Sequence, residues 1–201
     1  YRSLRQMLTE YGLDPNGITL MGDSAGGNLA AALCLLLKNL GEIQPKRQIL
    51  LYPATGYDYT ENSEFPSVIE NGYDYILTSA RIKEYLELYC PDPQLRKSPY
   101  VAPILAEDLS VLPQTLIFTS ELDPLRDEGE AFGKKLGEAG VPVKVWRAEG
   151  ALHGYVRWGL SNKHVASTYI VIAQTLEEEA LEELFDYYDS EALTEKYSNL
   201  M

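Results

Sequence analysis

Residues 22–28 read Gly-Asp-Ser-Ala-Gly-Gly-Asn, and this stretch decides the fold. An apolar segment at 17–22 precedes it, and an Ala- and Leu-rich segment at 28–38 follows it. The pattern G-x-S-x-G between a strand and a helix is typical of a sharp turn that holds a serine hydroxyl exposed, with glycines relieving the crowding of the turn. Ser24 is therefore a candidate nucleophile. The alternative is a plain glycine-rich turn in which Ser24 caps the following helix.

Short apolar strands alternate with helices along the rest of the chain. Strands are expected at 17–22, 47–52, 115–119 and 141–147, and helices at 2–11, 28–38, 128–139 and 165–184. Buried strands that alternate with helices indicate an α/β layer with a parallel sheet. The sequence thus predicts about four parallel strands flanked by helices.

Residues 54–100 interrupt this rhythm between the second and third strands. A structureless loop of that length is uncommon in a compact domain, so the segment predicts a cap-like insertion over a site. Residues 78–89 read as a helix inside it, with Thr78 as the N-cap. The apolar face of this helix is expected to carry Ile82, Tyr85, Leu86 and Tyr89.

Charge and cysteine content exclude some classes of partner. The 201 residues include 30 acidic and 17 basic side chains, a net charge of -13, which argues against nucleic acid or an anionic membrane surface. The sequence contains no run of about 18 apolar residues, so it predicts no membrane-spanning helix. Cys34 and Cys90 make no disulfide framework, which favours a reducing compartment and hence the cytoplasm. Much of the acidity lies in residues 177–201, which we interpret as an acidic helical extension with a solvated face.

Two further candidates follow the third and fourth strands. Asp123 lies in Leu-Asp-Pro-Leu-Arg-Asp-Glu-Gly at 122–129, and His153 lies in Gly-Ala-Leu-His-Gly at 150–154. A lone loop Asp is more often a cap, and a lone loop His is usually unremarkable. A serine, an acid and a histidine in this order, each just after a separate strand, instead indicate a nucleophile, an orienting acid and a general base. The second histidine, His164, is expected at the surface.

The chain resembles the hormone-sensitive-lipase-like family of α/β-hydrolases, which includes bacterial acetyl esterases and carboxylesterases. The resemblance covers about residues 1–176 and is carried by Gly-Asp-Ser-Ala-Gly-Gly-Asn at 22–28, Tyr-Pro at 52–53, Ser-Pro-Tyr-Val-Ala-Pro at 98–103, Glu-Leu-Asp-Pro-Leu-Arg-Asp-Glu at 121–128 and Glu-Gly-Ala-Leu-His-Gly-Tyr at 149–155. It implies that residues 1–176 are part of an α/β-hydrolase catalytic domain, with 54–100 as its cap-like insertion.

The resemblance also implies the chemistry. It implies a serine carboxylesterase that hydrolyses short-chain acyl esters through an acyl-enzyme, with a small-molecule ester as substrate and no metal or organic cofactor. Ser24 is then the nucleophile, Asp123 the orienting acid and His153 the general base. The backbone N–H of Ala25 is one donor of the oxyanion hole. The tyrosines of 54–100 fit either an amphipathic wall for a short acyl or alcohol group or ordinary packing of a cap on the core.

One departure from the family bears on activity. Members carry His-Gly-Gly-Gly well upstream of the nucleophile, where its N–H groups complete the oxyanion hole, and this sequence has no such segment. We therefore expect the chain to be the C-terminal half or two-thirds of a longer enzyme. Because each oxyanion donor contributes about 10²–10³ in turnover, a catalytically impaired fragment is one alternative to an active esterase.

The same fold also accommodates functions besides ester hydrolysis. A non-enzymatic binding module would be expected to lose a residue of the triad, and a peptidase or amidase would use the same chemistry. The strand at 17–22 would expose an unpaired edge if its upstream neighbour were missing. The isolated chain is then expected to aggregate, to form a homo-oligomer through this edge or to need the missing segment.

Overall fold

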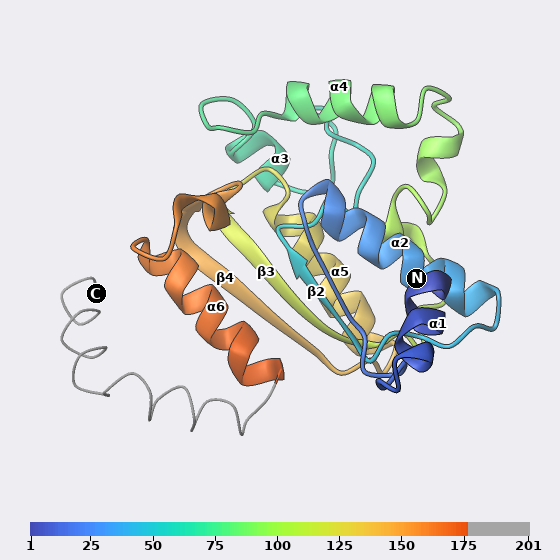
Figure 1. Cartoon of the computed structure of the whole chain (residues 1–201). Helices are drawn as coiled ribbons and strands as arrows, with labels where there is room; N and C mark the ends of the chain where they lie inside the picture. Colours follow the sequence, from blue (N-terminus) through green and yellow to red (C-terminus); the bar gives the residue numbers. More distant parts are fainter. Residues whose placement is uncertain (177–201) are drawn as a thin grey trace. The chain divides into compact units, whose positions relative to one another are not determined.

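The computed structural model describes residues 1–176, which divide into two compact units, residues 1–153 and the part from residue 154 onward. The first unit is built around a four-stranded sheet in which every neighbouring pair of strands is parallel (Figure 1). In the order in which they lie side by side, the strands are β1 (Thr19–Asp23), β2 (Arg47–Leu51), β3 (Gln114–Leu122) and β4 (Val143–Leu152). The predicted fold class, about four parallel strands flanked by helices, is confirmed.

Two long helices of the first unit share one hydrophobic core with the sheet. The helices of this unit outside the insertion are α1 (Arg2–Glu10), α2 (Ala25–Asn39), the short η2 (Pro103–Leu105) and α5 (Arg126–Glu138). Leu35 of α2 and Phe132 of α5 pack in the same cluster as Leu50 of β2 and Ile117 of β3. Because the two strand residues are register partners, both helices cover the same face of the sheet. This packing fixes the start of α2, and therefore Ser24, at the carboxyl end of β1.

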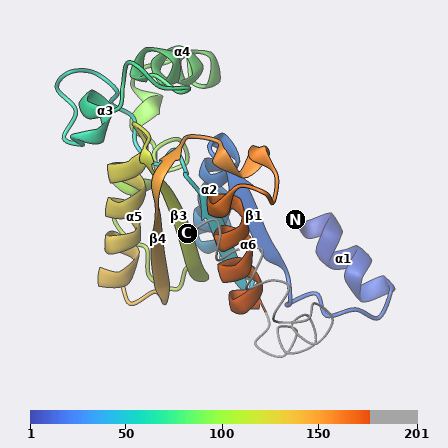
Figure 2. The ribbon, with the colours of Figure 1, turned by 90° about the vertical axis from the view of Figure 1, so that its left-hand side faces the viewer.

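The insertion lies beyond one end of the sheet, as two views agree (Figure 1, Figure 2). Its helices are α3 (Ser67–Glu70), α4 (Ser79–Tyr89) and the short η1 (Leu95–Lys97). Val68 of α3 and Ile82 of α4 share a buried cluster with Leu125, which lies in the turn after β3. The insertion is therefore packed onto the part of the chain that carries Asp123.

For the helix α4, the predicted N-cap is confirmed, whereas the predicted apolar face is wrong in part. Thr78 is its N-cap, and its hydroxyl oxygen accepts the backbone N–H of Arg81 at 3.3 Å, as predicted. The predicted apolar face is wrong for two of its four residues, because Tyr85 and Tyr89 are each 56% exposed while Ile82 is buried. A helix at the edge of a compact unit contacts the core along only one narrow face, so the side chains beside that face stay exposed. The helix α3 was not predicted, since four residues are too few to show a period.

The strand β1 forms one edge of the described sheet, where β2 is its only partner. Its Met21 side chain is 47% exposed. An apolar strand edge with free N–H and C=O groups is a template for pairing. Self-association through this edge stays a prediction.

The second unit contains the short helix η3 (Tyr155–Trp158) and α6 (Lys163–Leu176). The Tyr155 hydroxyl and the Thr168 hydroxyl lie 2.6 Å apart and link the two helices. The acidic helical extension predicted at 177–201 lies outside the described residues. Among residues 1–176, none of the helices has the length and apolar content to cross a bilayer.

Candidate active site

Ser24 occupies the turn between β1 and α2 with a backbone conformation that non-glycine residues rarely adopt, φ 56° and ψ −117°. Its N–H donates to the carbonyl of Leu51 at 2.8 Å, which holds the turn against the end of β2. Ala54 N–H donates to the Ser24 carbonyl at 3.3 Å. Strained residues of this kind persist only where their surroundings over-determine them, and they cluster at functional sites.

The glycines around Ser24 differ in what they allow. A Cβ on Gly22 would collide with the carbonyl of Gly26, so a side chain there would open the turn. A Cβ on Gly27 would lie 2.8 Å from the Cβ of Pro53, which also excludes a side chain. Gly26 itself would make only an ordinary contact at 3.9 Å. The expectation that both glycines flanking the serine relieve crowding is therefore right for the first and wrong for the second, whose role Gly27 takes.

A shift in strand register brings His153 level with Asp123. Between Ser120 and Leu122 the pairing of β3 with β4 jumps, because Ser120 pairs with Ala148 whereas Leu122 pairs with Leu152. Between these two pairs, one residue of β3 therefore lies opposite three of β4, which is a bulge in β4. Asp123 and His153 follow directly after the last register pair, so they leave adjacent strand ends side by side.

The three predicted side chains meet at this edge of the sheet. His153 Nδ1 lies 2.6 Å from Asp123 Oδ2, and His153 Nε2 lies 3.0 Å from Ser24 Oγ. The Asp123 side chain is fully buried, and its other oxygen accepts the N–H of Leu125 at 2.9 Å. The His153 side chain is 11% exposed, so it is mostly shielded from solvent. Hydroxyl, imidazole and carboxylate thus form one continuous hydrogen-bonded chain.

Tyr52 forms part of the wall around His153. The two rings meet edge to face with their centroids 4.8 Å apart, and Tyr52 is 1% exposed. Its backbone has φ 36°, a value that is a genuine outlier for a bulky residue. The Tyr52 N–H donates to the Phe118 carbonyl at 2.6 Å, which helps to hold this conformation. The Tyr-Pro pair is recognisable in the sequence, but nothing in the sequence indicates contact with the imidazole.

Ala25 is the first residue of α2 and is exposed. The N–H groups in the first turn of a helix have no carbonyl partner within that helix, and the helix dipole favours negative charge there. The Ala25 N–H belongs to this first turn, and its role as an oxyanion donor stays a prediction. No group of three or more His, Cys, Asp or Glu side chains within residues 1–176 is arranged to hold a metal ion.

Asn28 ties both ends of the insertion to α2, the helix that begins directly after Ser24. Its amide nitrogen donates to the carbonyl of Ala54 at 2.8 Å and to that of Val101 at 2.7 Å. Sequence reasoning did not single it out, although a buried amide one turn into an apolar helix is a signal that could have done so.

Glu128 is a second residue that sequence reasoning missed. It is fully buried on α5, four residues before Phe132, so a carboxyl group occupies the apolar face of the helix. Its Oε1 accepts the N–H groups of Thr55 at 2.6 Å and Gly56 at 3.0 Å and the hydroxyl of Tyr59 at 3.1 Å. Within residues 1–176 its Oε2 has no hydrogen-bond partner. Burial raises the pKa of Glu128 to about 7, although these hydrogen bonds act in the opposite direction.

This raised pKa predicts a pH-dependent stability. The folded protein holds the Glu128 proton up to about pH 7, whereas the unfolded chain releases it near its ordinary value of 4.5. The contribution of Glu128 to the free energy of unfolding is therefore fully present below about pH 4.5, and it is lost as the pH rises through about 7. Glu128→Gln keeps an acceptor but cannot ionise, so its free energy of unfolding relative to the wild type should rise by roughly 3 kcal/mol between pH 4.5 and 8. Urea titrations of both proteins across this range measure the difference, and parallel profiles would refute the prediction.

The sequence pattern of the α/β-hydrolase fold family matches residues 1–157. The chain is an α/β-hydrolase. The resemblance to the hormone-sensitive-lipase-like branch is confirmed by relatives that carry esterase names. The α/β-hydrolase is 35% identical over 147 residues to the arylesterase of Saccharolobus solfataricus, which covers 73% of this chain and 47% of that protein. It is 37% identical over 154 residues to carboxylesterase NlhH of Mycobacterium tuberculosis, covering 75% of this chain and 47% of that one.

Solved structures agree with this assignment. The esterase of Pyrobaculum calidifontis superposes with a TM-score of 0.79 at 36% identity, covering 89% of the α/β-hydrolase chain and 58% of that chain. Carboxyl esterase 2 of Tuber melanosporum superposes with a TM-score of 0.71 at 34% identity, covering 77% and 50%. The α/β-hydrolase thus spans about half the length of the curated relatives it matches.

Proposed function

We propose that this α/β-hydrolase is a serine carboxylesterase that hydrolyses short-chain acyl esters through an acyl-enzyme. The observation that carries the proposal is the continuous chain from Asp123 through His153 to Ser24, with atom separations of 2.6 and 3.0 Å. The esterase names of relatives at 35% and 37% identity support an ester as the substrate. A binding module on this fold would have no need for three such side chains within mutual reach.

Acylation uses His153 as the base. Neutral His153 takes the Ser24 proton on Nε2 while Oγ attacks the ester carbonyl carbon. Asp123, buried beside Nδ1, holds the imidazole in the tautomer whose Nε2 is free and stabilises the imidazolium that forms. The negative charge on the carbonyl oxygen develops near the Ala25 N–H at the start of α2.

Collapse of the tetrahedral intermediate releases the alcohol. The bond from the carbonyl carbon to the alkoxide oxygen breaks, and His153 Nε2 gives its proton to that oxygen. A water molecule then attacks the acyl-enzyme with His153 again as base, and the acid departs as Ser24 recovers its proton. The cycle is redox-neutral and consumes one water.

A series of p-nitrophenyl esters tests the proposal. The acetate, butyrate, octanoate and palmitate esters are assayed with the 201-residue chain and with the full-length protein that its gene encodes. The anilide p-nitroacetanilide serves as the amide counterpart. We expect kcat/KM to be highest for acetate or butyrate and to fall at least about tenfold towards palmitate, since a pocket for short acyl groups excludes extra methylenes. Preference for palmitate would contradict the short-chain proposal, and preference for the anilide would replace esterase by amidase.

Location remains a prediction of the sequence. Cys34 and Cys90 are both free and buried. Unpaired thiols are typical of reducing compartments, which supports the cytoplasmic location expected from composition.

A further inference from the structure

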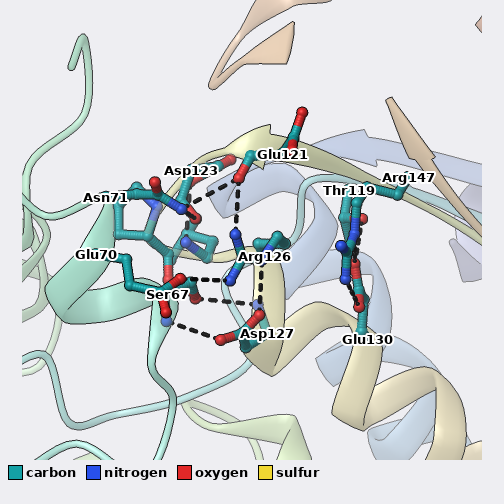
Figure 3. A network of polar contacts seen from close by, with 12 residues as sticks. Ser67, Glu70, Asn71, Thr119, Glu121, Asp123, Arg126, Asp127, Glu130 and Arg147 are labelled. Atoms are coloured by element: carbon teal, nitrogen blue, oxygen red, sulfur yellow. Dashed lines mark hydrogen bonds and ion pairs between the residues drawn. The ribbon is translucent and has the colours of Figure 1, made fainter. Parts of the chain in front are cut away.

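The helix α3 of the insertion is bonded directly to the turn that carries Asp123 (Figure 3). The Ser67 N–H donates to Asp127 Oδ2 at 2.7 Å, and the Ser67 hydroxyl donates to the Pro124 carbonyl at 2.9 Å. The Asp127 N–H returns a bond to the Ser67 hydroxyl oxygen at 3.1 Å. These bonds fix α3 relative to the backbone on the C-terminal side of Asp123.

Asn71, the C-cap of α3, reaches the other side of the same turn. Its amide nitrogen donates to the carbonyl of Glu121 at 3.1 Å and to the carbonyl of Asp123 at 3.3 Å (Figure 3). Asn71 is 5% exposed, so water offers these carbonyls little replacement if the amide is removed. One side chain of the insertion therefore holds the backbone of the acid itself.

Glu121 connects the backbone that Asn71 holds to the loop of His153. Its Oε2 accepts the N–H of Gly150 at 2.5 Å, and Gly150 has φ 75° within the bulge of β4. That bulge is what brings His153 level with Asp123. Glu121 thus bonds the bulge through its carboxylate, while its carbonyl is held by Asn71 and, at 3.1 Å, by Arg126.

We propose that Asn71 and Glu121 are positioning residues that hold Asp123 and His153 at hydrogen-bonding distance. The inference rests on the proposed function, because it gives that pair a catalytic role. In this proposal both residues act through Asp123 and His153 and not through contact with the substrate. Asn71 fixes the carbonyl of Asp123, Glu121 fixes the bulge before His153, and the two meet at the carbonyl of Glu121. If the contacts of Asn71 or of Glu121 are lost, the distance between the Asp123 carboxylate and the His153 imidazole is expected to increase. A displacement of about 1 Å caused by a change remote from the chemistry can lower the rate by about 10²-fold.

The experiment compares four variants in the longest product of the gene. Asn71→Ala removes the amide, and Asn71→Asp removes its donors at almost constant shape. Glu121→Ala removes the acceptor, whereas Glu121→Gln keeps an oxygen for the Gly150 N–H. Asn62→Ala is the matched control, since Asn62 is an exposed amide of the same insertion. Active-site titration with p-nitrophenyl acetate gives kcat per working site.

Positioning predicts a split between kinetic constants. Asn71→Ala, Asn71→Asp and Glu121→Ala should lower kcat per titrated site by about 10- to 100-fold with KM within about twofold, because the substrate contacts are intact. Glu121→Gln and Asn62→Ala should stay within about threefold of the wild type. A fall in the titrated fraction with unchanged kcat per site would mean a structural role only and would overturn the inference.

A proton NMR signal separates this inference from the proposed function. The Nδ1 proton of His153, shared with Asp123 over 2.6 Å, is expected far downfield and is assigned by its absence in His153→Ala. Asn71→Ala and Glu121→Ala should move or broaden it, and Glu121→Gln should not. If the signal and kcat stay as in the wild type, the inference fails while the esterase proposal stands. If Ser24→Ala remains active, the proposed function fails, and the NMR signal still reports whether Asn71 and Glu121 hold the pair.

Discussion

Ser24→Ala is expected to lower kcat for p-nitrophenyl acetate by about 10⁴-fold or more, with KM changed by no more than about threefold. Alanine removes the oxygen that forms the bond to the acyl carbon, and no other described side chain occupies its place beside His153 Nε2. The proposed oxyanion donor and the binding surface stay, so hydrolysis should persist at about 10³–10⁴-fold above the rate in water. Initial-rate kinetics with a long time course measure this residual activity.

Ser3→Ala is the matched control for this variant. Ser3 is an exposed serine on α1, so the same loss of a hydroxyl should leave turnover within about twofold of the wild type. A Ser24→Ala protein that kept a tenth or more of the wild-type rate would remove Ser24 from its role.

Asp123→Asn is expected to lower kcat by about 10⁴-fold while the protein stays folded. The asparagine carbonyl can keep the bond from the Leu125 N–H at the Oδ1 position, which turns its amide NH₂ towards His153 Nδ1. Nδ1 must then accept instead of donate, so the imidazole carries its proton on Nε2. In that tautomer His153 cannot take the proton of Ser24.

Asp74→Asn serves as the control, because Asp74 is an exposed carboxylate of the insertion. Thermal unfolding checks that Asp123→Asn is folded, and kcat is normalised to the folded protein. Turnover by Asp123→Asn within about tenfold of the wild type would mean that the buried carboxylate does not orient the base.

Much of the fold follows from local pattern. The apolar runs ending near Ser24 and Leu51 and the run of Thr115 to Thr119 are strands of one parallel sheet, because buried strands cannot leave their backbone groups unpaired. The same pattern places Ser24, Asp123 and His153 after strand ends, and the order of these residues was enough to single them out. The fold prediction is confirmed, and the roles of the three side chains stay proposals.

The remaining features depend on contacts between distant segments. The bulge that shifts β4 by two residues is stabilised by the bond from the Gly150 N–H to Glu121, about 30 residues earlier in the chain, and leaves no periodic trace in the sequence. Glu128 looks like an ordinary first-turn acid until its burial is known. Asn71 and Asn28 act on carbonyls far along the chain, so only the folded structure reveals their partners.

The most direct measurement is covalent trapping with diethyl p-nitrophenyl phosphate, followed by intact mass and peptide mapping. A serine activated by His153 attacks the phosphorus, expels p-nitrophenolate and keeps a diethylphosphoryl group. We predict one such group per chain, on the peptide that contains Ser24, and none on Ser24→Ala; His153→Ala should label at least about 10²-fold more slowly. An unlabelled wild-type protein, or a label on any other residue, would contradict the account.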